Sequence, residues 1–327
     1  GMSDYKLAFS NHEDLEIEIK ERTLEEIINE RNLNKKILII YRNSKNSGNY
    51  FTALRISKYF NDSKLHNCDD KITKSEVLKY NHVIAFHFFK CFDFLEKCKN
   101  IRYTIVFTGT DCNYFEVPKL INYKNILNNA SNIITFNSEM KKRIKRIYKI
   151  DKTINIIKQA VDIQFQKIDI KETDYYLWVG KLRKIKNPEL MLEIASNRSD
   201  LNFIIIGDAE DEYKNINFPE NIKYLGIQDR NTVLNYINNS NGLINTSIEE
   251  GMSDTILSAM SLGVPVLVKN NSGNKSIVND KTGYLFNDLE EFNKIVIDDK
   301  KKLNSKIYIH NNHDLSNEHL EYQKLII

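Results

Sequence analysis

Long apolar runs are absent from this 327-residue chain. None approaches the ~18 residues that a membrane-spanning helix requires, so we expect no such helix. The beginning, "GMSDYKLAF", is polar and acidic, whereas a signal peptide is basic and then apolar. These two absences lead us to expect a cytoplasmic protein.

Cysteine is scarce, and neither sign of charge dominates. The cysteines Cys68, Cys91, Cys98 and Cys112 all lie in the first half at irregular spacing, which argues against a disulfide framework or a zinc site and favours reduced thiols. The 47 basic and 44 acidic residues leave a net charge of +3, which is too small to indicate nucleic acid as a partner.

Short apolar, β-branched runs alternate with helical patterns along most of the sequence. The length suits two domains of ~100–200 residues, and the runs are apolar on both faces, as in a parallel sheet covered by helices. We expect strands at 36–41, 82–88, 103–108, 132–136, 154–158, 175–180, 202–207, 242–246, 264–268 and 283–286. Helical spacing is found at 50–60, 138–149, 187–197, 230–238 and 254–262. This α/β pattern predicts two doubly wound, Rossmann-like parallel sheets.

The order of these segments divides the chain into parts. Residues 1–35 are predicted to form a helical extension, 36–166 the first Rossmann-like domain, and 167–310 the second. The polar stretch 164–174 is the expected linker. Ligands of doubly wound sheets bind at the carboxyl ends of the strands, so we expect the site in the cleft between the domains.

Two loops that follow predicted strands carry residues suited to anions. In 42–56, Gly48 and Asn49 open a helix whose free N–H groups suit an anion or a sugar hydroxyl, although a glycine there is also ordinary turn chemistry. The loop is not G-x-G-x-x-G, which argues against a nicotinamide cofactor. In 180–190, cations suited to clamping a diphosphate crowd before a helix, although a solvated basic loop is the alternative: Lys181, Arg183, Lys184 and Lys186.

A third loop, "EEGMSDTILSAM" (249–260), joins a predicted strand to a helix that starts near Asp254. Its backbone N–H groups form a second predicted anion site, which would face the basic loop if the two strands are neighbours. Taken singly, Glu249 and Glu250 are equally well surface carboxylates.

Three other segments leave alternatives open. His87 ends the run "HVIAFH" and is either a buried structural histidine or a cleft residue. The acidic "GDAEDEY" (207–213) is better explained as an exposed loop than as a metal site. The basic helix 138–149 is either a solvated face or a peripheral contact with an anionic membrane.

Several of these stretches together resemble a known family. "VGKLRKIKN", "FIIIGD", "KYLG" and "EGMSDTILSAMSLGVPVL" follow one another with the order and spacing of retaining nucleotide-sugar glycosyltransferases of the GT-B fold, family 4. The first half is similar through "SGNYFTALR", "TGTD" and "AVDIQF", features shared with the branch described as glycosyltransferase 1 domain-containing proteins.

The resemblance implies roles for residues at matching positions. Arg183 and Lys186 would clamp the diphosphate of the donor, with Lys181 in place of a common arginine, while Glu250 would contact donor-sugar hydroxyls and His87 would lie near the anomeric carbon. Residues 311–327 would form a helix that crosses back to the first domain. The remaining residues implied to bind substrate are Gly48, Asn49, Asp111, Gly251, Met252, Ser253, Asp254, Thr255 and Ser258.

The sequence also departs from the family pattern. A second motif glutamate, which holds the donor ribose, falls on Ser258, and Asp254 stands where an uncharged residue is usual. Thr110 replaces a histidine, and "QAVD" replaces N-G-V-D.

The leading hypothesis is therefore a cytoplasmic retaining glycosyltransferase. It would move a sugar from a nucleoside-diphosphate sugar to a glycan, lipid or small-molecule acceptor, with no cofactor and no metal, since no D-x-D motif is present. A degenerate domain that binds a sugar nucleotide or a partner without transfer is the alternative. A nucleotide-sugar epimerase on the same fold is a third reading that the motif fits less well.

Overall fold

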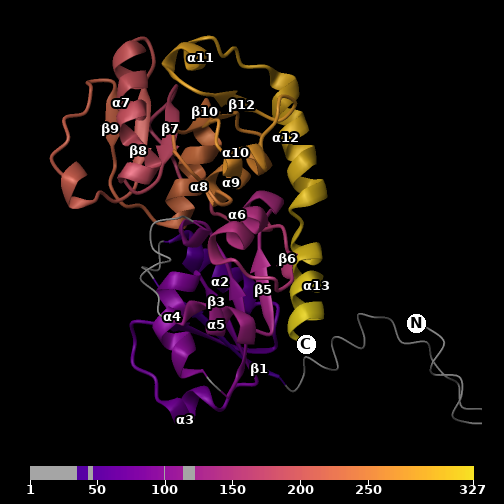
Figure 1. The fold of residues 1–327 in the computed structure, drawn as a ribbon. Helices are drawn as coiled ribbons and strands as arrows, with labels where there is room; N and C mark the ends of the chain where they lie inside the picture. The colour runs from indigo at the N-terminus through magenta and orange to yellow at the C-terminus, as the bar shows by residue number, and fades with distance from the viewer. Residues whose placement is uncertain (1–34, 43–46, 99, 113–121) are drawn as a thin grey trace, which may run out of the picture.

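The computed structural model describes residues 35–42, 47–98, 100–112 and 122–327. The predicted helical extension 1–35 lies outside this part of the chain, apart from Lys35. Two α/β domains are stacked one above the other, each built around one sheet (Figure 1).

The first domain contains a six-stranded parallel sheet in the order β2-β1-β3-β4-β5-β6. Its strands are β1 Lys36–Tyr41, β2 Asp62–Asn67, β3 His82–Phe86, β4 Arg102–Val106, β5 Asn132–Thr135 and β6 Ile154–Ile156. Its helices are α2 Gly48–Ser57, α3 Lys74–Val77, α4 Phe88–Lys97, α5 Tyr123–Asn129 and α6 Ser138–Tyr148, with a short 3-10 turn η1 Thr110–Cys112.

The second domain has a matching parallel sheet in the order β12-β11-β10-β7-β8-β9. Its strands are β7 Tyr176–Val179, β8 Phe203–Ile206, β9 Ile222–Tyr224, β10 Gly242–Asn245, β11 Val266–Lys269 and β12 Tyr284–Phe286. Its helices and 3-10 turns are η3 Lys184–Lys186, α7 Pro188–Asn197, η4 Asp211–Tyr213, α8 Arg230–Asn239, α9 Asp254–Leu262, α10 Ser272–Lys275, α11 Leu289–Asn293 and α12 Asp299–Asn312. The predicted class, two doubly wound parallel sheets, is confirmed.

Sequence reasoning found ten of these strands and missed β2 and β9. Both form an edge of their sheet. β2 reads "DSKLHN", and only His66 within it is buried. An edge strand needs no apolar residues on both faces, so the signal that revealed the central strands is missing there.

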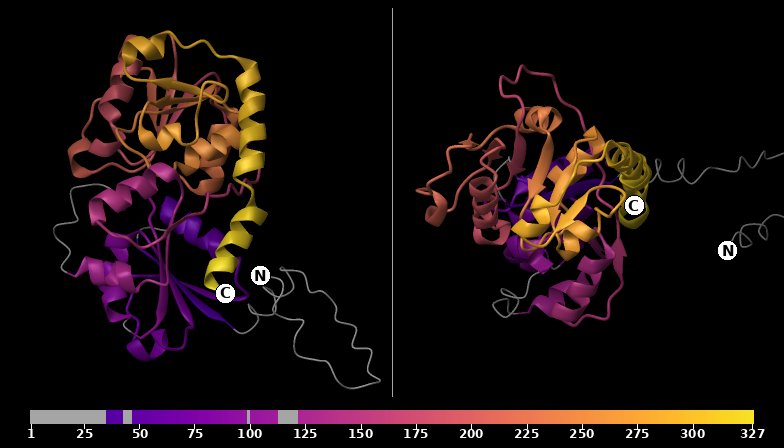
Figure 2. Two further views of the ribbon diagram at one scale, coloured as in Figure 1. Left: turned by 45° about the vertical axis from the view of Figure 1, so that its right-hand side comes forward. Right: turned by 90° about the horizontal axis from the view of Figure 1, so that it is seen from above.

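The chain ends with a helix that packs on the first domain. α12 runs beside the second domain, and α13 (Leu315–Ile326) continues beside the first (Figures 1 and 2). Glu318 of α13 is buried, and its carboxylate accepts bonds from Arg55 Nε at 2.7 Å, Arg55 Nη2 at 2.9 Å and Tyr59 Oη at 2.5 Å. The backbone N–H of Ala160 donates to the same carboxylate at 3.0 Å. α13 therefore ties the end of the chain to the first domain through a buried charge pair.

The segment between the two sheets, 157–175, contains neither helix nor strand. All four cysteines are free, and the Sγ atoms of Cys68 and Cys91 lie 3.4 Å apart as neighbouring thiols. In the described part of the chain, no helix is both long and apolar enough to span a membrane.

Candidate functional site

The basic loop after β7 lies beside the acidic loop after β10. The two loops are neighbours because β7 pairs with β10. From the sequence, we could predict that the loops face each other only if these two strands were neighbours. Thr246 joins the two loops, because its Oγ1 accepts a bond from Trp178 Nε1 and donates one to the Lys186 carbonyl, both at 2.9 Å. The backbone N–H of Ile248 adds a bond of 2.9 Å to the carbonyl of Ile185.

Glu250 is the centre of this junction. Its Oε1 accepts hydrogen bonds from Lys186 Nζ at 2.5 Å, Ser247 Oγ at 2.7 Å and Asn245 Nδ2 at 3.2 Å. The side chain is 10 % exposed. Among the described residues, none donates to the second oxygen, Oε2, so one half of the carboxylate is left for a ligand hydroxyl.

Glu250 remains ionised despite its burial. Burial acts to raise the pKa of this carboxyl group, but the Lys186 ammonium and the bonds from Ser247 and Asn245 outweigh it, and the pKa lies below its ordinary value. The site therefore presents a fixed acceptor for hydrogen bonds at neutral pH.

Two asparagines that sequence reasoning missed hold the loop from behind. Asn271 Nδ2 donates to the Ser247 carbonyl at 2.8 Å, and Asn274 Nδ2 donates to Asn245 Oδ1 at 3.2 Å. Gly273 lies between them, where a Cβ would come within 2.2 Å of the Glu250 carbonyl oxygen. The clustered asparagines of "NNSGNKS" are a possible signal, but only the fold brings them to Glu250.

Helix α9 begins next to Glu250 with a satisfied N-terminal cap. Ser253 Oγ accepts the N–H of Ile256 at 3.5 Å and lies 3.0 Å from Thr255 Oγ1. Asp254, whose charge would oppose a diphosphate, forms an ion pair of 2.7 Å with Arg230 Nη1. The acidic departure from the family pattern is thus matched by a basic residue on α8.

Ser258 is buried at 1 % exposure, one helical turn inside α9. Its Oγ has no hydrogen-bond partner among the described residues. A hydroxyl enclosed in this way has no open path to a ligand in this arrangement, so the structure gives no support to ribose binding by Ser258.

The first domain touches the Glu250 loop directly. A Cβ on Gly251 would lie 2.7 Å from the Thr108 carbonyl oxygen, so only glycine fits at this contact. Asn137 Nδ2 donates to the Gly251 carbonyl at 3.0 Å. Arg143 of α6 donates to Glu249 Oε2 at 3.0 Å and to the Glu250 carbonyl at 3.1 Å. Glu249 is therefore tied to the domain boundary, and Met252, the next residue after Gly251, is buried at 8 %.

His87 lies on the first-domain side of the boundary, between β3 and α4. Its φ of 76° is left-handed, which is costly for a residue with a side chain. His87 Nε2 and Thr110 Oγ1 are 2.6 Å apart, so the threonine that replaces a family histidine pairs with the histidine that remains.

Asp111 holds this arrangement together. It has 0 % exposure, and its carboxylate accepts backbone N–H groups of Gly109 at 2.8 Å, Phe88 at 2.9 Å and Thr108 at 3.0 Å. A carboxylate enclosed in this way cannot reach a substrate. We therefore correct the expected binding role: Asp111 positions the loop and the start of α4.

The cations of the basic loop point to different partners. Lys181 Nζ lies 3.8 Å from Glu210 and 4.0 Å from Asp208, so it forms ion pairs with the acidic loop 207–213. Lys186 forms an ion pair with Glu250. Arg183 is partly buried and, among the described residues, has no ion-pair partner. Of the three cations to which the resemblance gives a role, Arg183 is the one without an ion-pair partner among the described residues; the exposed Lys184 has none there either.

Lys90, on the first turn of α4, is a residue that sequence reasoning missed. Burial lowers its pKa first, and the charge of Arg183 in the second domain lowers it further. The two cations therefore approach each other across the domain boundary. One lysine in the run "FFKCF" carries no sequence signal of this role.

Two other predicted segments also find their place. Gly48 and Asn49 begin α2, and a Cβ at Gly48 would meet no described atom within 4 Å, so the space beside it is open. Residues 43–46 of that loop lie outside the described part of the chain. Helix α6 buries Met140, Ile144 and Tyr148, and its Arg143 faces the second domain; Lys142, Lys145 and Lys149 remain exposed.

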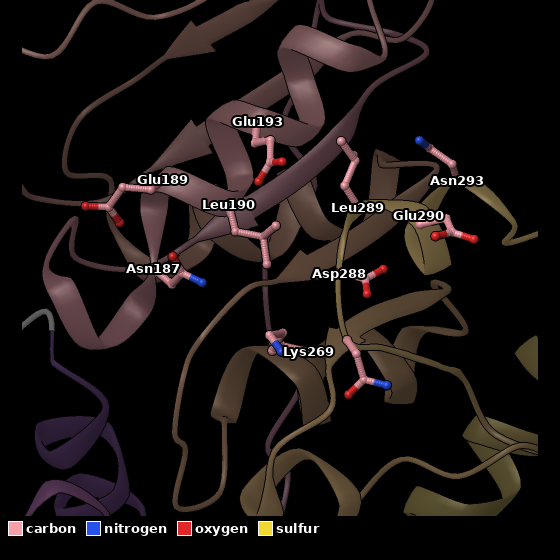
Figure 3. A pocket seen from close by; sticks show the side chains of 10 residues that line it. Asn187, Glu189, Leu190, Glu193, Lys269, Asp288, Leu289, Glu290 and Asn293 are labelled. Atoms are coloured by element: carbon pink, nitrogen blue, oxygen red, sulfur yellow. The ribbon is translucent and has the colours of Figure 1, made fainter.

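A separate pocket of about 720 Å³ lies in the second domain between α7 and α11. Figure 3 shows Leu190 and Glu193 on one side and Leu289 and Glu290 on the other. Four carboxylates against the single Lys269 make it unsuitable for a diphosphate. Among the described residues, no group of three or more His, Cys, Asp or Glu is placed to hold a metal ion.

Comparison with known proteins agrees with this geometry. Residues 160–306 match the family Glycosyl transferases group 1. The chain carries a glycosyl transferases group 1 domain. This glycosyltransferase domain contains both loops that meet at Glu250, and α9 and α10 as well.

Relatives of the glycosyltransferase domain extend the match to the rest of the chain. Glycosyltransferase 1 domain-containing protein 1 of Xenopus tropicalis is 26% identical over 341 residues, covering 89% of this chain and 97% of that protein. UDP-Gal:alpha-D-GlcNAc-diphosphoundecaprenol alpha-1,3-galactosyltransferase of Escherichia coli is 31% identical over 192 residues, 49% of each. Anabaena HepE, solved in complex with UDP-glucose, superposes with a TM-score of 0.75 at 13% identity, covering 89% of this chain and 99% of that one. The two stacked parallel-sheet domains are thus a GT-B fold.

Proposed function

We propose that the protein is a retaining glycosyltransferase that takes a sugar from a nucleoside-diphosphate sugar. The observation that carries this proposal is the junction at Glu250, where an ionised carboxylate lies at the N-terminus of α9, next to the loop of Arg183, which has no ion-pair partner among the described residues. Carboxylate oxygens suit sugar hydroxyls, and cations and helix N–H groups suit a diphosphate.

The chemistry follows from where charge develops. As the acceptor oxygen bonds to the anomeric carbon, the bond from that carbon to the diphosphate oxygen breaks, and the acceptor proton passes to the departing diphosphate. Arg183 and the amides of Gly251 to Thr255 would stabilise the negative charge that the diphosphate gains. His87, held by Thr110, would orient the sugar next to the acceptor. In this account protein cations take the place of a metal ion.

A uridine diphosphate sugar is the first donor to test, because the superposed HepE binds UDP-glucose and the E. coli relative is named for UDP-Gal. The acceptor is a separate question; the acceptor in the E. coli name is a diphosphate-linked lipid. Free cysteines accord with the cytoplasmic location that the sequence predicts.

A second candidate function, sugar-nucleotide binding without transfer, is favoured by Ser258. The ribose-holding carboxylate is missing, and the serine is enclosed. Both candidates predict weak donor binding, with Kd in the high-micromolar to millimolar range, ~4–6 kcal/mol.

Binding of nucleoside diphosphates distinguishes these two candidate functions from a function that involves no sugar nucleotide. Thermal shift with uridine, guanosine and adenosine diphosphates and their sugars should show a preference for one nucleoside diphosphate, reduced in Arg183→Ala and retained in Lys181→Ala. No response to any of them at 5–10 mM, ~3 kcal/mol of affinity or less, would remove both candidates. Turnover then distinguishes the transferase from the binder.

A further inference from the structure

A groove of about 940 Å³ runs along α4 in the first domain. Its other wall is the segment between β2 and α3, at the lower left of Figure 1. One end lies at the carboxyl ends of β1 and β2, where Arg42, Cys68 and Lys90 line it. The groove therefore starts at the domain boundary, one helical turn from His87, and leads away from the donor site.

The near end of the groove holds a partly buried cation, Lys90, beside Arg42, Asp69 and Asp70. Lys90 has no ion-pair partner among the described residues, and Arg42 and Arg183 both lower its pKa after burial does. Arg42 is balanced by Asp69 at 2.7 Å, and Asp111, which acts in the opposite direction on Lys90, is already bonded to backbone amides. A partly buried ammonium group without a counter-ion is unfavourable, so Lys90 suits an anionic group of a ligand.

The rest of the groove offers apolar surface. Phe94, Ile72 and Val77 line it, and Leu78 is 51 % exposed. Charged side chains of both signs also line the groove, and over its whole length they balance: Arg42, Lys71, Lys74, Lys90 and Lys97 against Asp69, Asp70, Glu76, Asp93 and Glu96. The groove thus combines a balanced, partly apolar wall with one partly buried lysine, Lys90, that has no ion-pair partner among the described residues.

We propose that this groove binds the acceptor, and that the acceptor carries a phosphate group held by Lys90 and Arg42 next to an apolar group that lies against Phe94 and Leu78. This inference rests on the proposed transferase function, because only a transferase has an acceptor. The binding of such a phosphate to the groove does not itself require transfer. With its phosphate at Lys90, an acceptor hydroxyl would reach the region between His87 and Glu250. Lipid-linked and small aromatic phosphates share this chemistry.

Calorimetric titrations with farnesyl phosphate, phenyl phosphate, farnesol and inorganic phosphate test the proposal. Farnesyl or phenyl phosphate should bind at least about tenfold tighter than both inorganic phosphate and farnesol, because each lacks one half of the interaction. Which of the two binds more tightly distinguishes a lipid from a small aromatic source. No advantage for either would overturn the proposal.

Variants place the site. Lys90→Ala should weaken the preferred phosphate about tenfold or more, and Leu78→Asp should weaken it without unfolding the protein, since Leu78 is half exposed. Lys124→Ala removes the same charge from the exposed surface of α5 and should change nothing. Binding by Lys90→Ala at the level of the natural protein would refute the assignment.

Competition separates this proposal from the donor site. UDP should leave binding of the preferred phosphate in place, and Arg183→Ala should weaken UDP more than that phosphate. If UDP displaces the phosphate from the natural protein, Lys90 belongs to the donor site and the proposal fails. If UDP binds nowhere while the phosphate result holds, the donor assignment fails and the groove stands.

Discussion

Lys186 and Glu250, which follow neighbouring strands of the second sheet, form an ion pair of 2.5 Å. The pair is largely enclosed, with the two side chains 20 % and 10 % exposed. It balances the charge of the carboxylate that we propose holds the sugar, and Arg183 is the cation that we propose meets the diphosphate. The resemblance implied that both cations clamp the diphosphate, whereas the geometry assigns Lys186 to positioning Glu250.

Because of this ion pair, the free energy of unfolding should decrease as the pH falls. The folded-state pKa of Glu250 is below its ordinary value, so its contribution is complete above about pH 5 and is lost as pH falls through the folded pKa. Urea unfolding from pH 7 to pH 3 should show a steeper loss for the natural protein than for Glu250→Gln. The exposed Glu290→Gln is the control and should keep the natural slope. Equal slopes for Glu250→Gln and the natural protein would rule out an ionised, stabilising Glu250.

Arg183 and Lys181 give a matched test of the donor site, two residues apart in one loop. Arg183→Ala should weaken UDP by roughly 1.5–3 kcal/mol, about 10–150-fold, and uridine little, because the lost contact is to phosphate. Lys181→Ala should change neither, since Lys181 faces Asp208 and Glu210. Ligand-observed NMR suits such weak binding. If the two variants weaken UDP binding equally, Arg183 is not part of the donor site.

The ion pair of Arg230 and Asp254 leads us to predict that a second substitution restores UDP binding lost in the first. Arg230→Ala should weaken UDP severalfold without any direct contact, because Asp254 at the start of α9 would then face the diphosphate unbalanced. The double variant Arg230→Ala/Asp254→Asn should recover most of the loss. The same NMR titration measures both; failure of the second change to restore binding would show that Arg230 acts in another way, for example through Phe51, whose ring lies 4.9 Å from it.

The buried pair of Arg55 and Glu318 should fasten α13. Glu318→Gln leaves the Arg55 charge enclosed, and breaking such a pair costs about 3–5 kcal/mol of unfolding free energy. Hydrogen exchange should also rise across 314–327. Glu321→Gln, in an exposed pair with Lys324, should stay within about 0.5 kcal/mol of the natural protein. Unchanged exchange in Glu318→Gln would mean that other contacts hold the helix.

The sequence reveals most of the fold because the central strands are apolar on both faces, as "KILIIY" and "FIIIG" show. It also predicts Glu250, Lys186 and Arg183 as site residues, because they lie in loops after strands and at positions that match the family resemblance. It cannot reveal Lys90 or Arg230, because each acts on a residue far away in the chain, Arg183 or Asp254, and only packing brings them together. Asp111 was misassigned for the same reason: a carboxylate in a turn looks the same whether it accepts backbone amides or a ligand.

Nucleoside diphosphate release measures the central claim most directly. The purified protein would be incubated with a panel of nucleoside-diphosphate sugars and hydroxyl-bearing candidate acceptors in the presence of EDTA. The account predicts acceptor-dependent release of one nucleoside diphosphate with the anomeric configuration retained, lost in Glu250→Gln and kept in Glu290→Gln. Release that stops with EDTA and returns with manganese would contradict the metal-independent mechanism, and equal release by Glu250→Gln would contradict the site itself.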